Sequence, residues 1–234
     1  MRTLLQVFST SRLVSAVILL ASAVPVAWAN GGGMSMPQPM STPREETPQH
    51  KAREAYNDGV HYIKKADKAQ AGAEQQNDPG RKEKAGHEAH ELYAKSLTKF
   101  QEAVQLDDTL PEAWNYVGYS NRKLGNYDAA LAAYDKALAL KPGYADALEY
   151  RGEAYLALNR IPDAEQAYLD LYASNRALAA KLLAAMKSWV AVQRANPSAG
   201  ATGLDELDKW IQERSQIARE TAALTREGTA ARWR

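Results

Sequence analysis

Residues 111–144 read PEAWNYVGYSNRKLGNYDAALAAYDKALALKPGY, and part of this pattern returns 34 residues later in the chain. The recurring residues are Tyr116 as Tyr150, Gly118 as Gly152, Leu124 as Leu158, Ala130 as Ala164 and Tyr134 as Tyr168. A fixed period of this length is typical of stacked helical hairpins, because one hairpin is too small to bury its own apolar face. The period therefore predicts an all-α, right-handed solenoid and favours a binding function over catalysis.

The first 29 residues have the composition of a secretory signal peptide. Arg2 and Arg12 flank a polar start, residues 13–23 are apolar, and Ala27-Trp28-Ala29 has the small-x-small form of a cleavage site. We predict cleavage after Ala29 and a periplasmic or secreted location in a bacterium. The alternative is a retained anchor helix, although residues 13–29 are at the short limit for a membrane span.

The charge balance and the absence of cysteine exclude several classes of function. The chain has 29 basic and 28 acidic residues, and removal of the signal peptide leaves 29 − 2 = 27 basic and 28 acidic residues. This balance gives no reason to expect nucleic acid or an anionic membrane surface as a partner. Because the chain contains no cysteine, disulfides, thiolate metal sites and a cysteine nucleophile are excluded.

Two segments precede the clear repeats. Residues 30–50 are rich in glycine and proline and are predicted to be a disordered linker. Residues 51–110 are predicted to form a degenerate first hairpin, in which Gly59 and Phe100 take the places of Gly118 and Tyr134. The first pair is 41 residues apart and the second 16, which indicates an insertion of about 25 residues, expected as longer helices with a turn at residues 77–80.

Two hairpins, 111–144 and 145–178, follow this segment, and residues 179–230 change character. An apolar helix face is expected around Leu182 and Met186, then a loop over 196–203 and a last helix over 205–226. The end of a solenoid needs a helix with a polar outer side. Residues 179–230 are therefore predicted to be C-terminal capping helices.

The hairpin 111–144 resembles the tetratricopeptide repeat, in which small and aromatic residues occupy fixed positions. The residues that carry the resemblance are Trp114, Val117, Gly118, Ala130, Tyr134, Ala137 and Pro142, and Asn121 departs from the pattern. The hairpin 145–178 matches at Leu148, Gly152, Tyr155, Ala164 and Tyr168, and departs at Arg151, Leu171 and Arg176. In this family the small residues let two helices approach closely, and the aromatic residues fill the space between hairpins.

The resemblance implies a protein or peptide partner, bound on the concave face that the first helix of each hairpin forms. Carried over by position, this face includes Tyr56, Asn57, Val60 and Lys64, then Asn115, Tyr116, Tyr119, Arg122 and Lys123, then Asp146, Glu149, Tyr150 and Glu153. Tyrosines offer a large contact area with a polar tip. The alternative is that Tyr116 and Tyr150 pack within the array while the charged residues only solvate it.

Charge on this face predicts the kind of ligand. Arg122 and Lys123 make a positive strip, and Glu149 and Glu153 make a negative strip one helix further on. We therefore expect a bound segment of mixed charge. Family members that grip a terminal carboxylate use Asn, Lys and Arg, but here the two glutamates would repel an acidic tail.

Other functions have weaker support in the sequence. A structural subunit could dock on a larger envelope complex through Trp189, Trp210 and Trp233. Methionines 34, 36 and 40 offer only weak copper ligands, and His87 and His90 are three apart rather than four, so no metal site is predicted. No catalytic constellation or phosphate-binding loop is present, and we expect neither enzymatic activity nor a cofactor.

Overall fold

The computed structural model describes residues 47–196 and 200–231, with side chains described up to residue 224. All regular structure in these ranges is helical, which confirms the all-α prediction. The eight helices are α1 (Pro48–Glu74), α2 (Pro79–Leu106), α3 (Pro111–Lys123), α4 (Tyr127–Leu140), α5 (Ala145–Ala157), α6 (Ile161–Ser174), α7 (Arg176–Ala195) and α8 (Leu204–Ala231). The predicted signal peptide and most of the predicted linker lie outside the described residues.

Side-chain caps fix where several helices begin. Asp78 Oδ1 accepts a hydrogen bond from the backbone N–H of Arg81 at 2.8 Å, so the predicted turn ends as α2 begins. Asn175 Oδ1 accepts from the N–H of Leu178 at 3.1 Å and starts α7 directly after α6. Thr47 caps α1, and residues 48–50, which the sequence placed in the linker, are therefore helical.

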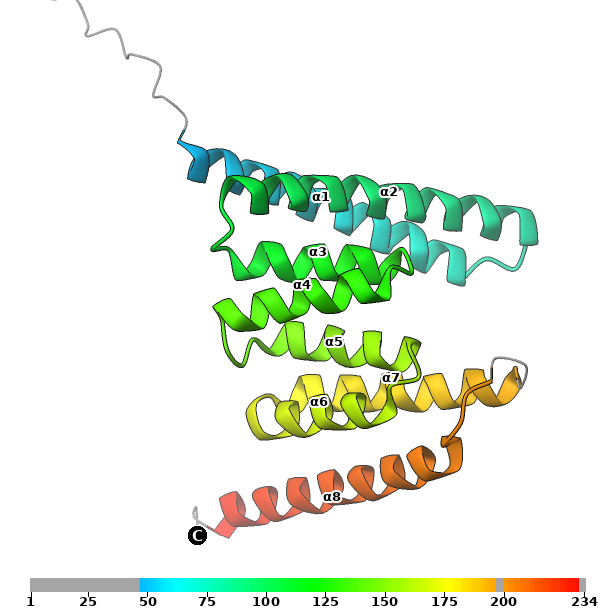
Figure 1. Ribbon diagram of the computed structural model, residues 1–234. Coiled ribbons are helices and arrows are strands. Elements are labelled where there is room, and N and C mark those ends of the chain that lie inside the picture. Colours follow the sequence, from blue (N-terminus) through cyan, green and yellow to red (C-terminus); the bar gives the residue numbers. More distant parts are fainter. Residues whose placement is uncertain (1–46, 197–199, 232–234) are drawn as a thin grey trace, which may run out of the picture. The chain divides into compact units, whose positions relative to one another are not determined.

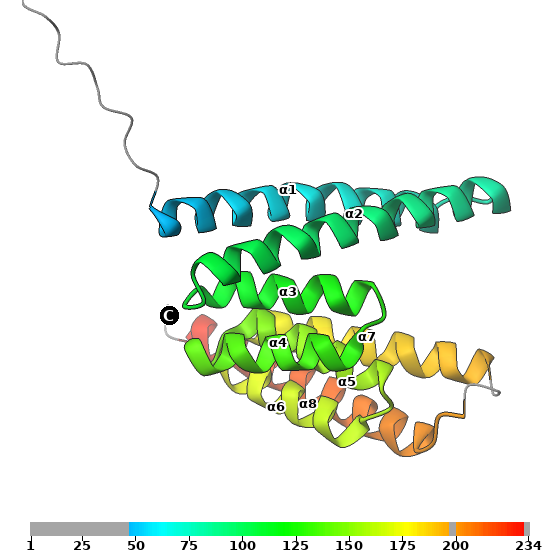
Figure 2. The ribbon, with the colours of Figure 1, turned by 45° about the horizontal axis from the view of Figure 1, so that its top comes forward.

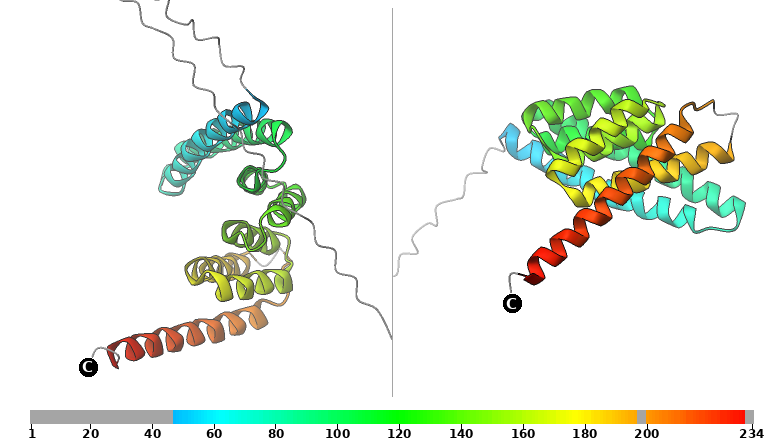
Figure 3. Two further views of the ribbon diagram at one scale, coloured as in Figure 1. Left: turned by 90° about the vertical axis from the view of Figure 1, so that its left-hand side faces the viewer. Right: turned by 90° about the horizontal axis from the view of Figure 1, so that it is seen from below.

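The helices stack as successive hairpins, α1 with α2, α3 with α4 and α5 with α6, followed by α7 and α8 (Figure 1). Each helix contacts the next one in the chain, and α5 contacts both α3 and α7. Figure 3 shows the same order of stacking from the side, with α8 at the end of the array. The first helices of the hairpins therefore form a continuous face, which is called the first-helix face below.

A glycine and an aromatic ring set the distance between the helices in each of the first two hairpins. A Cβ atom on Gly118 would lie 2.5 Å from Cε1 of Tyr134, and one on Gly59 would lie 2.7 Å from Cε1 of Phe100. Only a glycine leaves room for the ring at this spacing. Although α1 and α2 have 27 and 28 residues, against 13 and 14 for α3 and α4, both hairpins use the same contact.

The extra length of the first hairpin extends past the end of α3 (Figure 2). Its buried side chains between Asp67 and Tyr93 are the alanines Ala73 and Ala89. Small side chains allow α1 and α2 to run close together over this length without a large core.

The third hairpin departs from the other two. A Cβ atom on Gly152 would lie 2.6 Å from Cδ2 of Leu182 in α7, rather than against Tyr168, the residue at the position of Tyr134. Tyr168 instead stacks on Tyr172 and contacts the edge of Trp210 in α8. The expected pairing of Gly152 with Tyr168 is therefore wrong, because α7 fills the space beside α5.

Candidate partner-binding face

A row of aromatic rings crosses the first-helix face and joins α1 to α5. Tyr56 lies edge-on to Tyr116, with ring centroids 5.9 Å apart, and Tyr119 lies edge-on to Tyr150 at 4.9 Å. Phe100 of α2 stacks on Tyr116 at 4.9 Å. Burial raises the pKa of Tyr56 to about 12. These rings spend much of their area on each other, as expected of aromatic residues that hold neighbouring hairpins together.

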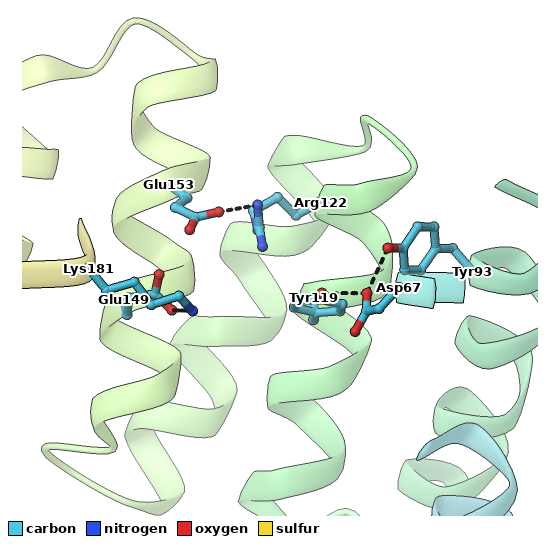
Figure 4. Close-up of polar contacts among 7 residues, drawn as sticks. All are labelled: Asp67, Tyr93, Tyr119, Arg122, Glu149, Glu153 and Lys181. Atoms are coloured by element: carbon cyan, nitrogen blue, oxygen red, sulfur yellow. Dashed lines mark hydrogen bonds and ion pairs between the residues drawn. The ribbon is translucent and has the colours of Figure 1, made fainter. Parts of the chain in front are cut away.

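A carboxylate that the sequence analysis did not single out ties the first hairpin to the second. Asp67 Oδ1 accepts hydrogen bonds from the hydroxyls of Tyr93, at 2.7 Å, and Tyr119, at 2.8 Å (Figure 4). Lys123 Nζ lies 5.5 Å from the centre of the Tyr119 ring and 5.7 Å from that of Tyr93. The signal that could have identified Asp67 is its helical spacing from Val60 and Ile63, which puts it on the inward side of α1.

The charged residues of the face are paired with one another. Arg122 of α3 forms an ion pair with Glu153 of α5, and Lys181 Nζ of α7 lies 3.1 Å from Glu149 Oε2 (Figure 4). The predicted positive and negative strips therefore neutralise each other across three helices. A ligand of mixed charge would find these charges already paired, which corrects the expectation of a dipolar groove.

Three of the predicted contact residues are buried beneath the face. The exposed fractions of Asn115, Tyr119 and Glu149 are 2%, 8% and 0%, so none is available to a partner as placed here. Burial, together with the neighbouring Glu153, raises the pKa of Glu149 to about 7. Of the remaining predicted residues, Tyr116, Tyr150, Arg122 and Glu153 are half-buried, and Lys123 is exposed.

Two hollows open on the first-helix face. A cavity of 240 Å³ lies between α1 and α3 and is lined by Arg53, Tyr56, Asn57, Leu110, Glu112 and Ala113. A second cavity, of 330 Å³, lies between α3, α5 and α7 and is called the α3–α5–α7 hollow below. Its lining residues are Arg122, Tyr127, Glu153, Leu156, Ala157, Ala185, Ser188, Trp189 and Val192.

The helical order, the glycine contacts and the shared first-helix face agree with one known repeat family. The model described as tetratricopeptide repeat matches residues 87–145 and again residues 118–181. These matches cover the hairpins in which Gly118 and Gly152 lie in close contact with a neighbouring side chain. The chain is a tetratricopeptide-repeat protein.

Several tetratricopeptide-repeat and related proteins are similar to this chain. The Hsp70-Hsp90 organizing protein of Triticum aestivum is 34% identical over 137 residues, which are 54% of this chain and 24% of that protein. The uncharacterized protein ycf37 of Guillardia theta is 32% identical over 85 residues, which are 34% of this chain and 48% of that protein. The chain thus matches less than half the length of either relative.

Among solved structures, the TPR2B domain of yeast Sti1 in its complex with pHsp70 is 16% identical, with a TM-score of 0.37 over 71% of this chain and 98% of that one. MamA is 22% identical, with a TM-score of 0.42 over 75% of this chain and 96% of that one.

The tryptophans of this tetratricopeptide-repeat protein do not share one docking surface. Trp189 lines the α3–α5–α7 hollow, whereas Trp210 packs edge-on against Tyr168 with centroids 5.2 Å apart. Trp233 lies outside the described residues. The structure therefore assigns Trp189 to the first-helix face and Trp210 to the contact between α6 and α8.

The described residues contain no group of three His, Asp or Glu side chains arranged to hold a metal ion. His87 lies 3.6 Å from Glu91 on the exposed side of α2, while the three methionines of the predicted linker lie outside the described residues. Within residues 47–196 and 200–231, no helix is long and apolar enough to cross a bilayer.

Proposed function

We propose that this tetratricopeptide-repeat protein is a non-enzymatic adaptor that holds a partner polypeptide on its first-helix face. The single observation that carries the proposal is the α3–α5–α7 hollow, where Val192 stays 60% exposed beside the half-buried Trp189. An aliphatic and an aromatic side chain that line one hollow are the usual composition of an anchor site for a protein partner. The repeat itself is a protein-interaction module.

We further propose that the adaptor works in the bacterial cell envelope, as a periplasmic or secreted protein. The support is the signal-peptide composition of residues 1–29, with its small-x-small site at Ala27-Trp28-Ala29. The lack of cysteine agrees with an exported protein that depends on its core alone. Intact-mass measurement of the envelope protein tests this point, because cleavage would leave a chain that starts at Asn30.

The name of the wheat relative describes an organiser of two other proteins, and this supports a scaffolding role. The match covers only 24% of that relative, however, so its partners are not transferred to this chain. The paired charges Arg122–Glu153 and Lys181–Glu149 also argue against simple capture of an acidic tail.

Co-purification of the protein from its own envelope, followed by mass spectrometry, tests the adaptor role. Val192→Lys should remove the captured partner, because a charge would then lie in the hollow. The matched control is Leu140→Lys, which changes an apolar residue of similar exposure, 43%, on α4. Equal capture by both variants would contradict the first-helix face as the binding surface.

A second candidate function is that of a structural subunit that docks through α8. Ile217 and Leu224 lie seven residues apart on this helix and are 40% and 69% exposed. Truncation after Asn196 would also remove Leu207 and Ile211, which are part of the core. The double substitution Ile217→Lys with Leu224→Lys is therefore the better test, and it should abolish capture only if α8 is the docking surface.

A further inference from the structure

We infer that the α3–α5–α7 hollow receives a bulky, uncharged apolar side chain of the partner and excludes a carboxylate. This inference rests on the proposed adaptor function and names the chemistry of its anchor. It differs from the expectation of a ligand of mixed charge.

The walls of the hollow are mostly apolar. Leu156 and Ala157 come from the end of α5, and Ala185, Trp189 and Val192 come from the second half of α7. Its volume of 330 Å³ equals that of about ten water molecules, at about 30 Å³ each. Water in this space meets the exposed Val192 and the edge of Trp189, and its release by an apolar side chain is favourable.

The charges at the hollow select against an ionised ligand. Arg122 and Glu153 both line it, and they form an ion pair with each other. A carboxylate that entered would have to compete with Glu153 for Arg122 while it lost its own hydration. An ammonium would have to compete with Arg122 for Glu153 in the same way. An uncharged side chain leaves the pair intact.

The nearest additional cations do not change this conclusion. Lys181 is engaged with Glu149, and Lys123 lies over the rings of Tyr93 and Tyr119 rather than in the lining of the hollow. Charge complementarity therefore favours a neutral occupant, and the size of the space favours a large one such as a Phe or Leu side chain.

The indole N–H signals of the tryptophans provide a direct test by nuclear magnetic resonance. The probes are N-acetyl-phenylalanine amide and N-acetyl-aspartate amide, each titrated into the purified ¹⁵N-labelled protein. We expect the phenylalanine probe to shift the Trp189 signal saturably, with little change at Trp114 and Trp210. The aspartate probe should bind at least about tenfold more weakly, which corresponds to about 1.4 kcal/mol.

Variants locate the effect. Val192→Lys should weaken the response to the phenylalanine probe at least about tenfold, while Leu140→Lys leaves it unchanged. Both sites are on the surface, so circular dichroism should show the same helix content as the parent protein. An equal response to the two probes, an equal shift at all tryptophans, or no shift at Trp189 would overturn the inference.

The two proposals fail in different ways. If a partner co-purifies but Trp189 does not respond to the phenylalanine probe, the adaptor function stands and the apolar anchor is wrong. If Trp189 responds as expected but no partner is captured through the first-helix face, the hollow is a binding site and the adaptor function is wrong.

Discussion

Substitution of Gly118 by alanine should destabilise the second hairpin, although alanine is the better helix former. The added Cβ atom would lie 2.5 Å, 2.6 Å and 2.9 Å from Cε1, Cδ1 and Cζ of Tyr134. Carbon atoms in contact normally stand about 3.5–4.0 Å apart, so the ring would have to move by about 1 Å. Tyr134 has an exposed fraction of 0% and therefore has no solvent to move into.

The expected magnitude is a balance of two effects. Overpacking of a buried site costs about 1–3 kcal/mol, and the gain in helix propensity from glycine to alanine is about 1 kcal/mol. We expect a net loss of about 1–2 kcal/mol. Gly72→Ala and Gly86→Ala are matched controls, because these two helical glycines have no atom within 4 Å of an added Cβ. Each control should gain about 0.5–1 kcal/mol.

Urea unfolding followed by circular dichroism at 222 nm measures these differences. A double-mutant cycle with Tyr134→Leu isolates the contact, because the cost of Gly118→Ala should fall when the ring is absent. If Gly118→Ala were as stabilising as Gly72→Ala, the close approach of α3 and α4 at this residue would be refuted.

Three further changes test other contacts. Gly59→Ala should cost about 1–2 kcal/mol in the same assay, because its Cβ atom would lie 2.7 Å from the Phe100 ring; stabilisation would contradict the first-hairpin contact. The raised pKa of Glu149, about 7, means that the folded state binds its proton more tightly than the unfolded state, so stability should fall by up to about 3 kcal/mol as the pH rises from 4.5 to 7. Glu149→Gln should remove that part of the pH dependence of the urea midpoint, and an unaltered dependence would contradict the assignment. Asp67→Asn should weaken two charge-assisted hydrogen bonds and lower the pKa of Tyr119, which burial and then the bond to Asp67 raise; an unchanged ultraviolet titration would contradict this.

The fold was predictable because its main contacts lie at fixed sequence spacings. Gly118 and Tyr134 are 16 residues apart, and the same contact occurs between Gly59 and Phe100 even though 41 residues separate them. The turn at residues 77–80 and the asparagine at 175 were also readable, because each supplies a side-chain cap. Such signals are local in sequence and depend little on the rest of the chain.

The surface of the first-helix face was less predictable, because it depends on which helix lies next to which. The sequence places Arg122 and Glu153 one repeat apart, but only the stacking of α3 on α5 reveals that they pair. Glu149 occupies the repeat position of Asn115 and looks like a surface residue until α7 covers it with Lys181. Val192 lies outside the repeats, so no family position pointed to the α3–α5–α7 hollow.

The long first hairpin has a consequence for how the molecule opens. Between Asp67 and Tyr93 the buried side chains are two alanines, so little apolar area opposes separation of the two strands of helix there. Amide hydrogens in this stretch should exchange with deuterated solvent well before those around Phe100, as a local event that leaves the rest of the stack closed. A protease added to the native protein would accordingly cut first near residues 75–78, and the fragment from Tyr93 onward would remain a folded stack.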